Sequence, residues 1–125
     1  TWLGIKPELP QIADKEGIIF VCPDGKNSWY WDSPLNKEYR YETFVSKELV
    51  NYIDKNFTTK VERGGRAITG LSMGGHGSLW LSIRHKDVFG GGGSMSGGLD
   101  IRPFPNNWEM KKQLGEEASN KQSKC

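Results

Sequence analysis

The most constraining feature of this chain is the stretch Gly70-Leu71-Ser72-Met73-Gly74, which joins a strand pattern to a helix pattern. Residues 66–69 have strand character, and residues 74–83 repeat apolar side chains at helical spacing. A Gly-x-Ser-x-Gly sequence between a strand and a helix predicts a sharp turn that projects the serine away from the sheet edge. We therefore expect Ser72 to be a nucleophile.

Two glycines flank this serine where a side chain would collide. Strand and helix approach each other closely around such a turn, and Gly70 and Gly74 lack the Cβ atom that would fill that space. The helix behind Ser72 directs unpaired N–H groups and the positive end of its dipole toward an oxyanion formed there, and the Met73 N–H is the expected first donor. The alternative is a glycine-rich turn that carries an inert serine.

Length and charge narrow the class of protein. The 125 residues could form one small domain, and the net charge of +2, spread along the chain, argues against a nucleic-acid partner. No apolar run approaches the roughly 20 residues needed to cross a bilayer, and no signal peptide pattern is present. The chain begins Thr1-Trp2 rather than with Met, so a lost leader or upstream segment stays open. The compartment is left undecided, cytoplasmic or exported.

The two cysteines, Cys22 and Cys125, have no metal-binding or redox spacing. Cys22 falls within an apolar run, and we expect it to be a small buried apolar residue.

The periodicity of the chain alternates between strand and helix patterns. The expected elements are a helix over 9–15 ended by Gly17, a strand over 18–22, a loop over 26–41, a helix over 42–57, a polar loop over 58–65, the strand and helix that flank Ser72, a strand over 91–96 and a helical stretch over 108–114. The run over 18–22 is apolar throughout, which predicts a strand buried on both faces.

This order of elements predicts right-handed crossovers and a parallel sheet in an α/β fold. A strand that is apolar on both faces needs neighbouring strands and helices on both sides, and the chain supplies few of them. We therefore expect the middle of a larger domain: residues 1–102 as a partial core and residues 103–125 as a polar tail, with 115–125 disordered or truncated.

The chain resembles the esterase D, tributyrin esterase and feruloyl esterase group of the α/β-hydrolase superfamily, with antigen 85 mycolyltransferases as more distant relatives. The resemblance covers about residues 1–102. It rests on Pro23-Asp24-Gly25, the segments 27–30 and 32–34, Tyr41-Glu42-Thr43-Phe44, residues 66–77 with the string G-L-S-M-G-G-H-G, and the segment from Phe89 to Met95-Ser96-Gly97.

The resemblance implies that Ser72 is the nucleophile that accepts the acyl group and that the Met73 N–H forms part of the oxyanion hole. The group's second oxyanion donor lies on a loop just before the position of Thr1-Trp2. The group's catalytic aspartate and histidine lie in the last third of the domain, and nothing in this chain matches them. No metal and no cofactor are implied.

The residues present here are poor substitutes for that histidine and aspartate. His76 follows Ser72 by four residues on the same helix, whereas the base must approach from the opposite side of the site, so we interpret His76 as structural. His85 ends that helix, about 20 Å from Ser72. Asp100, after the third strand, would have no histidine to orient, and Asp24 and Asp32 are interpreted as structural.

The loop carries Trp29, Tyr30 and Trp31 in a row, and three consecutive aromatic side chains cannot all face one core. The resemblance places this loop near the acyl or alcohol pocket. Trp2, Trp29 and Tyr30 are therefore candidate pocket residues, and an equally weighted alternative is that these side chains pack the loop onto other parts of the domain.

Three functions remain open at this point. The first is a carboxylic ester hydrolase that forms an acyl-enzyme on Ser72 and acts on short-chain acyl esters or on feruloyl or acetyl esters of carbohydrates, with S-formylglutathione as another substrate class. The second is acyl transfer to an alcohol. The third is a non-catalytic fragment or structural module, completed by another chain or by a second copy in a homo-oligomer. The expected partner is a small-molecule or carbohydrate ester, without nucleic acid or membrane.

Overall fold

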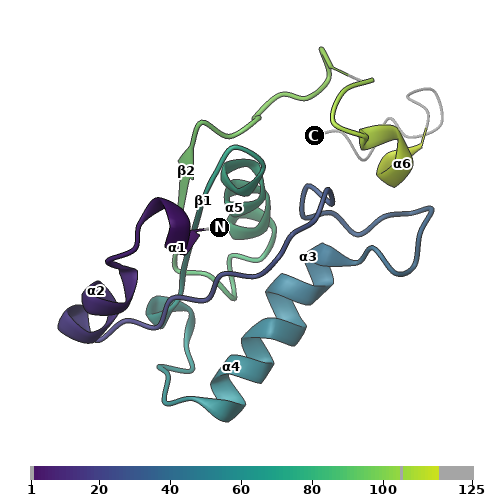
Figure 1. Ribbon diagram of the computed structural model, residues 1–125. Coiled ribbons are helices and arrows are strands. Elements are labelled where there is room, and N and C mark those ends of the chain that lie inside the picture. The colour runs from purple at the N-terminus through teal and green to yellow at the C-terminus, as the bar shows by residue number, and fades with distance from the viewer. Residues whose placement is uncertain (1, 105, 116–125) are drawn as a thin grey trace.

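A strand, a helix and a second strand form the centre of the computed structural model, which describes residues 2–104 and 106–115 (Figure 1). Strands β1 (Ala67–Leu71) and β2 (Gly91–Met95) pair in parallel, with Ala67 opposite Gly91 and Leu71 opposite Met95. Helix α5 (Met73–Arg84) leads from the end of β1 back toward the start of β2, the crossover that parallel strands require. The α/β class, the parallel sheet, and the strands predicted just before Ser72 and over 91–96 are confirmed.

The remaining elements are short helices before and after this unit. They are α1 (Trp2–Ile5), α2 (Leu9–Glu16), α3 (Tyr41–Thr43), the π-helix η1 (Phe44–Leu49), α4 (Val50–Asn56), the 3₁₀ turn η2 (Arg63–Gly65) and α6 (Met110–Leu114). Gly17 ends α2 in the left-handed region at φ 64°, as the sequence predicted for this glycine.

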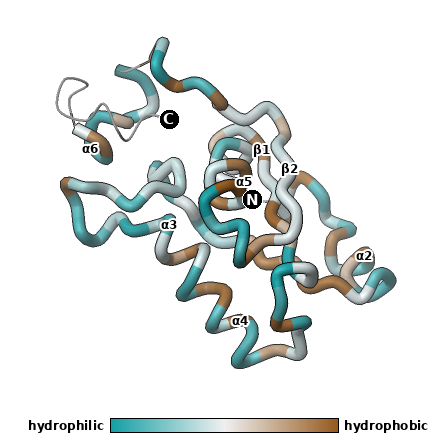
Figure 2. Tube along the Cα trace, turned by 180° about the vertical axis from the view of Figure 1, so that it is seen from behind, coloured by the Kyte–Doolittle hydropathy of each residue, from teal (hydrophilic) through white to brown (hydrophobic). Residues whose placement is uncertain are grey.

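The helix expected over 42–57 is present as α3, η1 and α4 in succession. Its π turn adds a residue to the helical repeat and so shifts the side-chain register along the element. The expected apolar stripe is therefore only partly buried: Val45 is buried, whereas Tyr52 is 59% exposed. Figure 2 shows apolar and polar residues alternating along α4.

The buried side chains of Val45, Leu81 and Phe89 hold this long helix against α5. Figure 1 shows the loop of residues 26–40 leading into α3, the end of the long helix nearer to α5, whereas α4 extends away from α5. Tyr30 and Ile68 also pack on this cluster, which ties the loop and β1 to the same core.

The prediction of a buried strand over 18–22 is wrong for the described chain. Residues 18–22 carry no strand pairing, and the four side chains before Cys22 are 40–48% exposed. A run that is apolar on both faces requires cover on both faces, and residues 2–104 and 106–115 cover these side chains only in part. The burial predicted for Cys22 is wrong for the same reason, since Cys22 is exposed.

The segment expected to be a polar tail contains a packed helix. α6 lies within the helical stretch predicted over 108–114, and its Met110, Gln113 and Leu114 are buried. Most of the stretch expected to be disordered, residues 116–125, lies outside the described residues, together with Cys125 and Thr1.

An ion pair links α4 to the start of β1 and allows a pH-dependent prediction. The Asp54 carboxylate accepts hydrogen bonds from Thr59 Oγ1 at 2.7 Å and from Arg66 Nη2 at 2.5 Å. The Thr59 hydroxyl, followed by the Arg66 guanidinium, lowers the pKa of Asp54. We expect Asp54→Ala to lower the free energy of unfolding by about 1–3 kcal/mol at pH 7, because Arg66 Nε is already buried without a described partner.

The sign of the pH effect follows from the lowered pKa. The stabilisation from Asp54 is complete above the unfolded-state pKa of about 3.9 and is lost as the pH falls through the lower folded-state pKa. Urea unfolding at pH 7 and in a series below pH 4 measures it. Glu16→Gln, which removes an exposed ion pair to Lys15, is the control without a measurable effect. A difference between Asp54→Ala and the parent that grew on acidification would contradict the prediction.

Candidate active site

Ser72 lies between the last residue of β1 and the first residue of α5, with an exposed side chain. Its backbone has φ 56° and ψ −116°, a sparsely populated conformation for a residue with a Cβ, with a cost on the order of 1–3 kcal/mol. Its N–H donates to the Met95 carbonyl at 2.9 Å, and its carbonyl accepts from the His76 N–H at 3.0 Å. The strained residue is therefore held from both sides, by β2 and by α5.

Of the two glycines, one is required by space and the other is not. A Cβ on Gly70 would fall onto the backbone of Gly74, much closer than van der Waals contact, so this part of the steric prediction is confirmed. A Cβ on Gly74 would meet nothing within 4 Å, so the collision expected there is wrong. The close approach is made by the backbone of Gly74, and only the residue facing it must lack a side chain.

Met73 is the first residue of α5 and is half-buried. The N–H groups of the first helical turn have no partner within the helix, and the dipole places partial positive charge there. The geometry is that of an exposed hydroxyl beside a donor-rich helix start, which suits attack on a carbonyl carbon and binding of the resulting oxyanion. The roles of Ser72 and Met73 stay predictions.

His76 is buried, 8% exposed, and its Nδ1 lies 2.9 Å from the Gly98 carbonyl oxygen. Since a carbonyl only accepts, Nδ1 carries the proton. Burial lowers the pKa of His76, and the bond to Gly98 offsets part of this effect. The ring is therefore neutral at pH 7 and bonded to the loop after β2 rather than to the Ser72 hydroxyl.

His85 lies just after the last residue of α5, at the opposite end from Ser72. Its Nε2 lies 2.8 Å from Glu42 Oε1, which also accepts from Arg84 Nε at 2.8 Å. Trp80 Nε1 donates to the other oxygen of Glu42. These contacts join α5 to α3, and His85 has a structural role in that connection.

The three aspartates also have local partners. Asp24 accepts from the Lys26 N–H, and Asp32 accepts from the N–H of Thr43 in α3. Asp100 forms two side-chain hydrogen bonds with Arg102, whose hydrogen bonds lower the pKa of Asp100 to about 2. The contacts of Asp24 and Asp32 are those of turn and helix-start residues, and no histidine is bonded to Asp100.

The aromatic loop divides its three side chains between two clusters. Residues 29 and 30 both have positive φ, and the Trp31 N–H donates to the Ser28 carbonyl across this tight turn. Trp29 and Trp31 consequently stack on one side, with ring centroids 5.9 Å apart, whereas Tyr30 packs against Gly77 of α5 and Gly25. The expectation that the three rings cannot share one core is confirmed.

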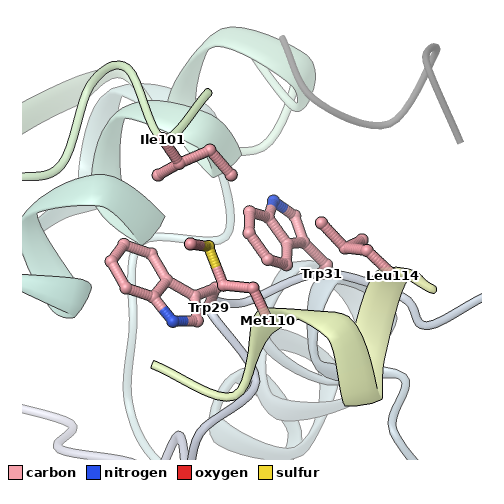
Figure 3. Packing of buried hydrophobic residues seen from close by; sticks show 5 residues of the cluster. All are labelled: Trp29, Trp31, Ile101, Met110 and Leu114. Carbon is pink, nitrogen blue, oxygen red and sulfur yellow. The ribbon is translucent and has the colours of Figure 1, made fainter. Parts of the chain in front are cut away.

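The cluster around the two tryptophans contains Trp29, Trp31, Ile101, Met110 and Leu114 (Figure 3). In Figure 3, Met110 and Leu114 point from α6 toward the two indole rings. α6 is also fastened by Ser33 Oγ, which donates to the Gln113 carbonyl at 2.6 Å. Sequence reasoning missed this cover, although the spacing of Met110 and Leu114 by four residues carried a signal for it.

Trp29 and Trp31 are 6% and 4% exposed, so the packing alternative describes both of them within this chain. Trp2 in α1 and Tyr30 are half-buried. The assignment of Trp2, Trp29 and Tyr30 to a substrate pocket stays a prediction. A cavity of about 380 Å³ lies at the other end of α5, where Glu42, Trp80, Arg84 and His85 contribute to its lining, and Ser72 is not among its lining residues.

Within residues 2–104 and 106–115, no group of three or more His, Cys, Asp or Glu side chains is arranged to hold a metal ion. None of the described helices has the length and hydropathy needed to cross a membrane.

The chain is similar in sequence to esterases and acyltransferases. The family model described as "Putative esterase" matches residues 4–124. The esterase Rv1288 of Mycobacterium tuberculosis (strain ATCC 25618 / H37Rv) is 35% identical over 104 residues, which cover 81% of this chain and 22% of that protein. The diacylglycerol acyltransferase/mycolyltransferase Ag85A of Mycobacterium leprae (strain TN) is 40% identical over 94 residues, which cover 69% of this chain and 28% of that protein.

Solved structures show the same fold. An S-formylglutathione hydrolase from Agrobacterium tumefaciens matches with a TM-score of 0.76 at 23% identity, over 94% of this chain and 50% of that chain, which bears on the fold alone. A ferulic acid esterase matches with a TM-score of 0.64 at 32% identity, over 85% of this chain and 43% of that chain. The chain thus spans half or less of each of these proteins and has the fold of a partial α/β-hydrolase domain.

Proposed function

The chain belongs to this esterase family, and on that premise we propose that the complete gene product hydrolyses carboxylic esters through an acyl-enzyme on Ser72. The observation that carries the proposal is the backbone of Ser72, held at φ 56° between β1 and α5 with an exposed hydroxyl. A strained serine at the start of a helix is the geometry that nucleophilic acyl transfer uses.

In the proposed reaction, Ser72 Oγ bonds to the ester carbonyl carbon and loses its proton to a base. The carbonyl oxygen becomes an oxyanion that accepts a hydrogen bond from the Met73 N–H. The C–O bond to the alcohol breaks, and the base returns the proton to the leaving alcohol. Water then attacks the acyl-enzyme, and the acid and free Ser72 are released.

The base and its carboxylate partner are proposed to come from outside residues 1–125. The sequence contains two histidines, and both are occupied elsewhere: His76 bonds to Gly98, and His85 bonds to Glu42. The proposed substrates are short-chain acyl esters, or feruloyl or acetyl esters of carbohydrates. Similarity to a ferulic acid esterase supports the second class.

The test is covalent labelling of the complete gene product with a fluorophosphonate, followed by identification of the labelled residue. We expect modification at Ser72 and parallel loss of hydrolysis of p-nitrophenyl butyrate. A folded protein that hydrolyses the ester while Ser72 stays unlabelled would exclude the proposed mechanism. A matched series of acetyl, butyryl and feruloyl esters then ranks the acyl groups.

Residues 1–125 expressed alone are expected to show little or no turnover, because neither histidine bonds to the Ser72 hydroxyl. Hydrolysis of p-nitrophenyl butyrate by the purified 125-residue chain measures this, with its Ser72→Ala variant as the background. Turnover close to that of the complete gene product, and lost in Ser72→Ala, would show that this chain carries its own base.

Acyl transfer to an alcohol is the second candidate, and the 40% identity to a mycolyltransferase supports it. The same Ser72 acyl-enzyme would form, and an alcohol rather than water would attack it. Product analysis at rising concentrations of a sugar acceptor distinguishes the two reactions: hydrolysis leaves the free acid as the main product at every concentration, whereas transfer yields a new ester.

A further inference from the structure

The loop after β2 lies in direct backbone contact with the first turn of α5. A Cβ on Gly75 would lie 2.8 Å from the Met95 carbonyl oxygen and 2.9 Å from Gly97 Cα. A Cβ on Gly97 would lie 2.6 Å from the Gly75 carbonyl carbon and 2.8 Å from the His76 nitrogen. Two glycines therefore face each other, and the hydroxyl of Ser94 in β2 lies beside them, closer than van der Waals contact to a Cβ at either position.

Two hydrogen bonds fasten this contact at its ends. The Ser72 N–H donates to the Met95 carbonyl at 2.9 Å, and the His76 Nδ1–H donates to the Gly98 carbonyl at 2.9 Å. The second bond is the side-chain tie between α5 and the loop at Gly98. Met95, which accepts from the Ser72 N–H, is the last residue of β2, and the loop that carries Gly97 and Gly98 begins directly after it. Displacement of the loop would therefore disturb the hydrogen bond that holds the Ser72 backbone.

The surroundings of His76 keep its donor in place. The ring makes edge contacts with Trp29 and Trp31, each with ring centroids 5.2 Å away, and stacks on Trp80 at 6.2 Å. Its Nε2 is buried without a hydrogen-bond partner among the described residues. A second proton on Nε2 would find no acceptor there, so the indole rings favour the neutral ring whose Nδ1–H points at Gly98.

We propose that His76 is a positioning residue for the nucleophile: its Nδ1–H holds the loop after β2 against the start of α5 and thereby keeps the Ser72 backbone in its strained conformation. The inference rests on the proposed function for its effect on the reaction. The proposed role of His76 is more than packing, because a ring that only filled the space among three indoles would not need an N–H that donates to the Gly98 carbonyl.

Two substitutions separate the hydrogen bond from the packing. His76→Asn places an amide N–H near the position of Nδ1 and removes most of the ring. His76→Phe keeps a ring among the indoles, removes the donor and removes the unpartnered Nε2. Val45→Ala, in the cluster between α5 and the long helix, is the control that lowers stability without touching the loop.

The readouts are the rate of fluorophosphonate labelling of Ser72 in the complete gene product, the thermal midpoint, and amide hydrogen exchange of Ser72 followed by NMR. We expect His76→Phe to keep the thermal midpoint and to label about tenfold to a hundredfold more slowly, because small displacements at a reacting group cost about that much. We expect His76→Asn to lower the midpoint and to label within about threefold of the parent, as Val45→Ala does.

Labelling of His76→Phe at the parent rate would overturn the inference, as would equal slowing in Asn and Phe variants. Failure of the parent itself to label would count against the proposed function instead, and the exchange measurement would still decide the positioning role. That role requires faster exchange of the Ser72 amide in His76→Phe than in His76→Asn, and equal protection in the two variants would exclude it.

Discussion

Ser72→Ala is expected to lower ester hydrolysis by the complete gene product by about 10⁴-fold to 10⁶-fold, the loss seen when the nucleophile of a serine enzyme is removed. Ser72 offers the one hydroxyl on the strained turn between β1 and α5, and without it no acyl-enzyme forms. The substitution should leave the thermal midpoint unchanged, because the Ser72 side chain is exposed and its removal breaks no buried contact. The measurement is kcat/KM on p-nitrophenyl butyrate with the thermal midpoint alongside.

Ser82→Ala is the matched control for that loss. Ser82 lies on the same helix, and its hydroxyl bonds to the Leu79 carbonyl rather than to the loop near the nucleophile. We expect its kcat/KM to stay within a few-fold of the parent. An active Ser72→Ala protein would show that the ester is cleaved at another group, and the role of Ser72 would have to be abandoned.

Gly70→Ala has the second largest expected effect, because its new Cβ would fall onto the backbone of Gly74. Backbone cannot rotate away as a side chain can, so β1 and α5 must separate. We expect a loss of about 3 kcal/mol in the free energy of unfolding and loss of Ser72 labelling. Urea denaturation and the fluorophosphonate rate measure the two effects.

Gly74→Ala tests whether that effect is steric or a general property of the motif. A Cβ there meets nothing within 4 Å, and alanine favours a helix over glycine by about 1 kcal/mol. We expect the stability of Gly74→Ala to equal or slightly exceed that of the parent. Equal destabilisation by the two alanines would contradict the steric account of Gly70.

The turn at Ser72 was predictable from sequence because everything that builds it is contiguous. The strand, the two glycines and the helix fall within residues 66–84, and local backbone preferences suffice to specify them. The one error about this turn concerned Gly74. The motif has a glycine two residues before and two residues after the serine, but only a Cβ on Gly70 would collide, and it would collide with the backbone of Gly74.

The packing of the aromatic loop was not predictable in the same way. Trp29 and Tyr30 adopt positive φ, which their residue types do not signal, and this conformation decides which ring faces which cluster. The cover of Trp29 and Trp31 comes from α6, about 80 residues later, as the Ser33–Gln113 hydrogen bond shows. The four-residue spacing of Met110 and Leu114 signals an apolar face on α6, but it does not say which distant residues that face covers.

The exposed apolar run over residues 18–21 has a consequence for handling. Uncharged segments rich in β-branched residues that are exposed and have no strand partner are templates for strand-to-strand aggregation. Apolar side chains on both faces suit a central strand that is covered by helices on both sides. The same side chains form an aggregation-prone surface where they are exposed, as residues 18–21 are here.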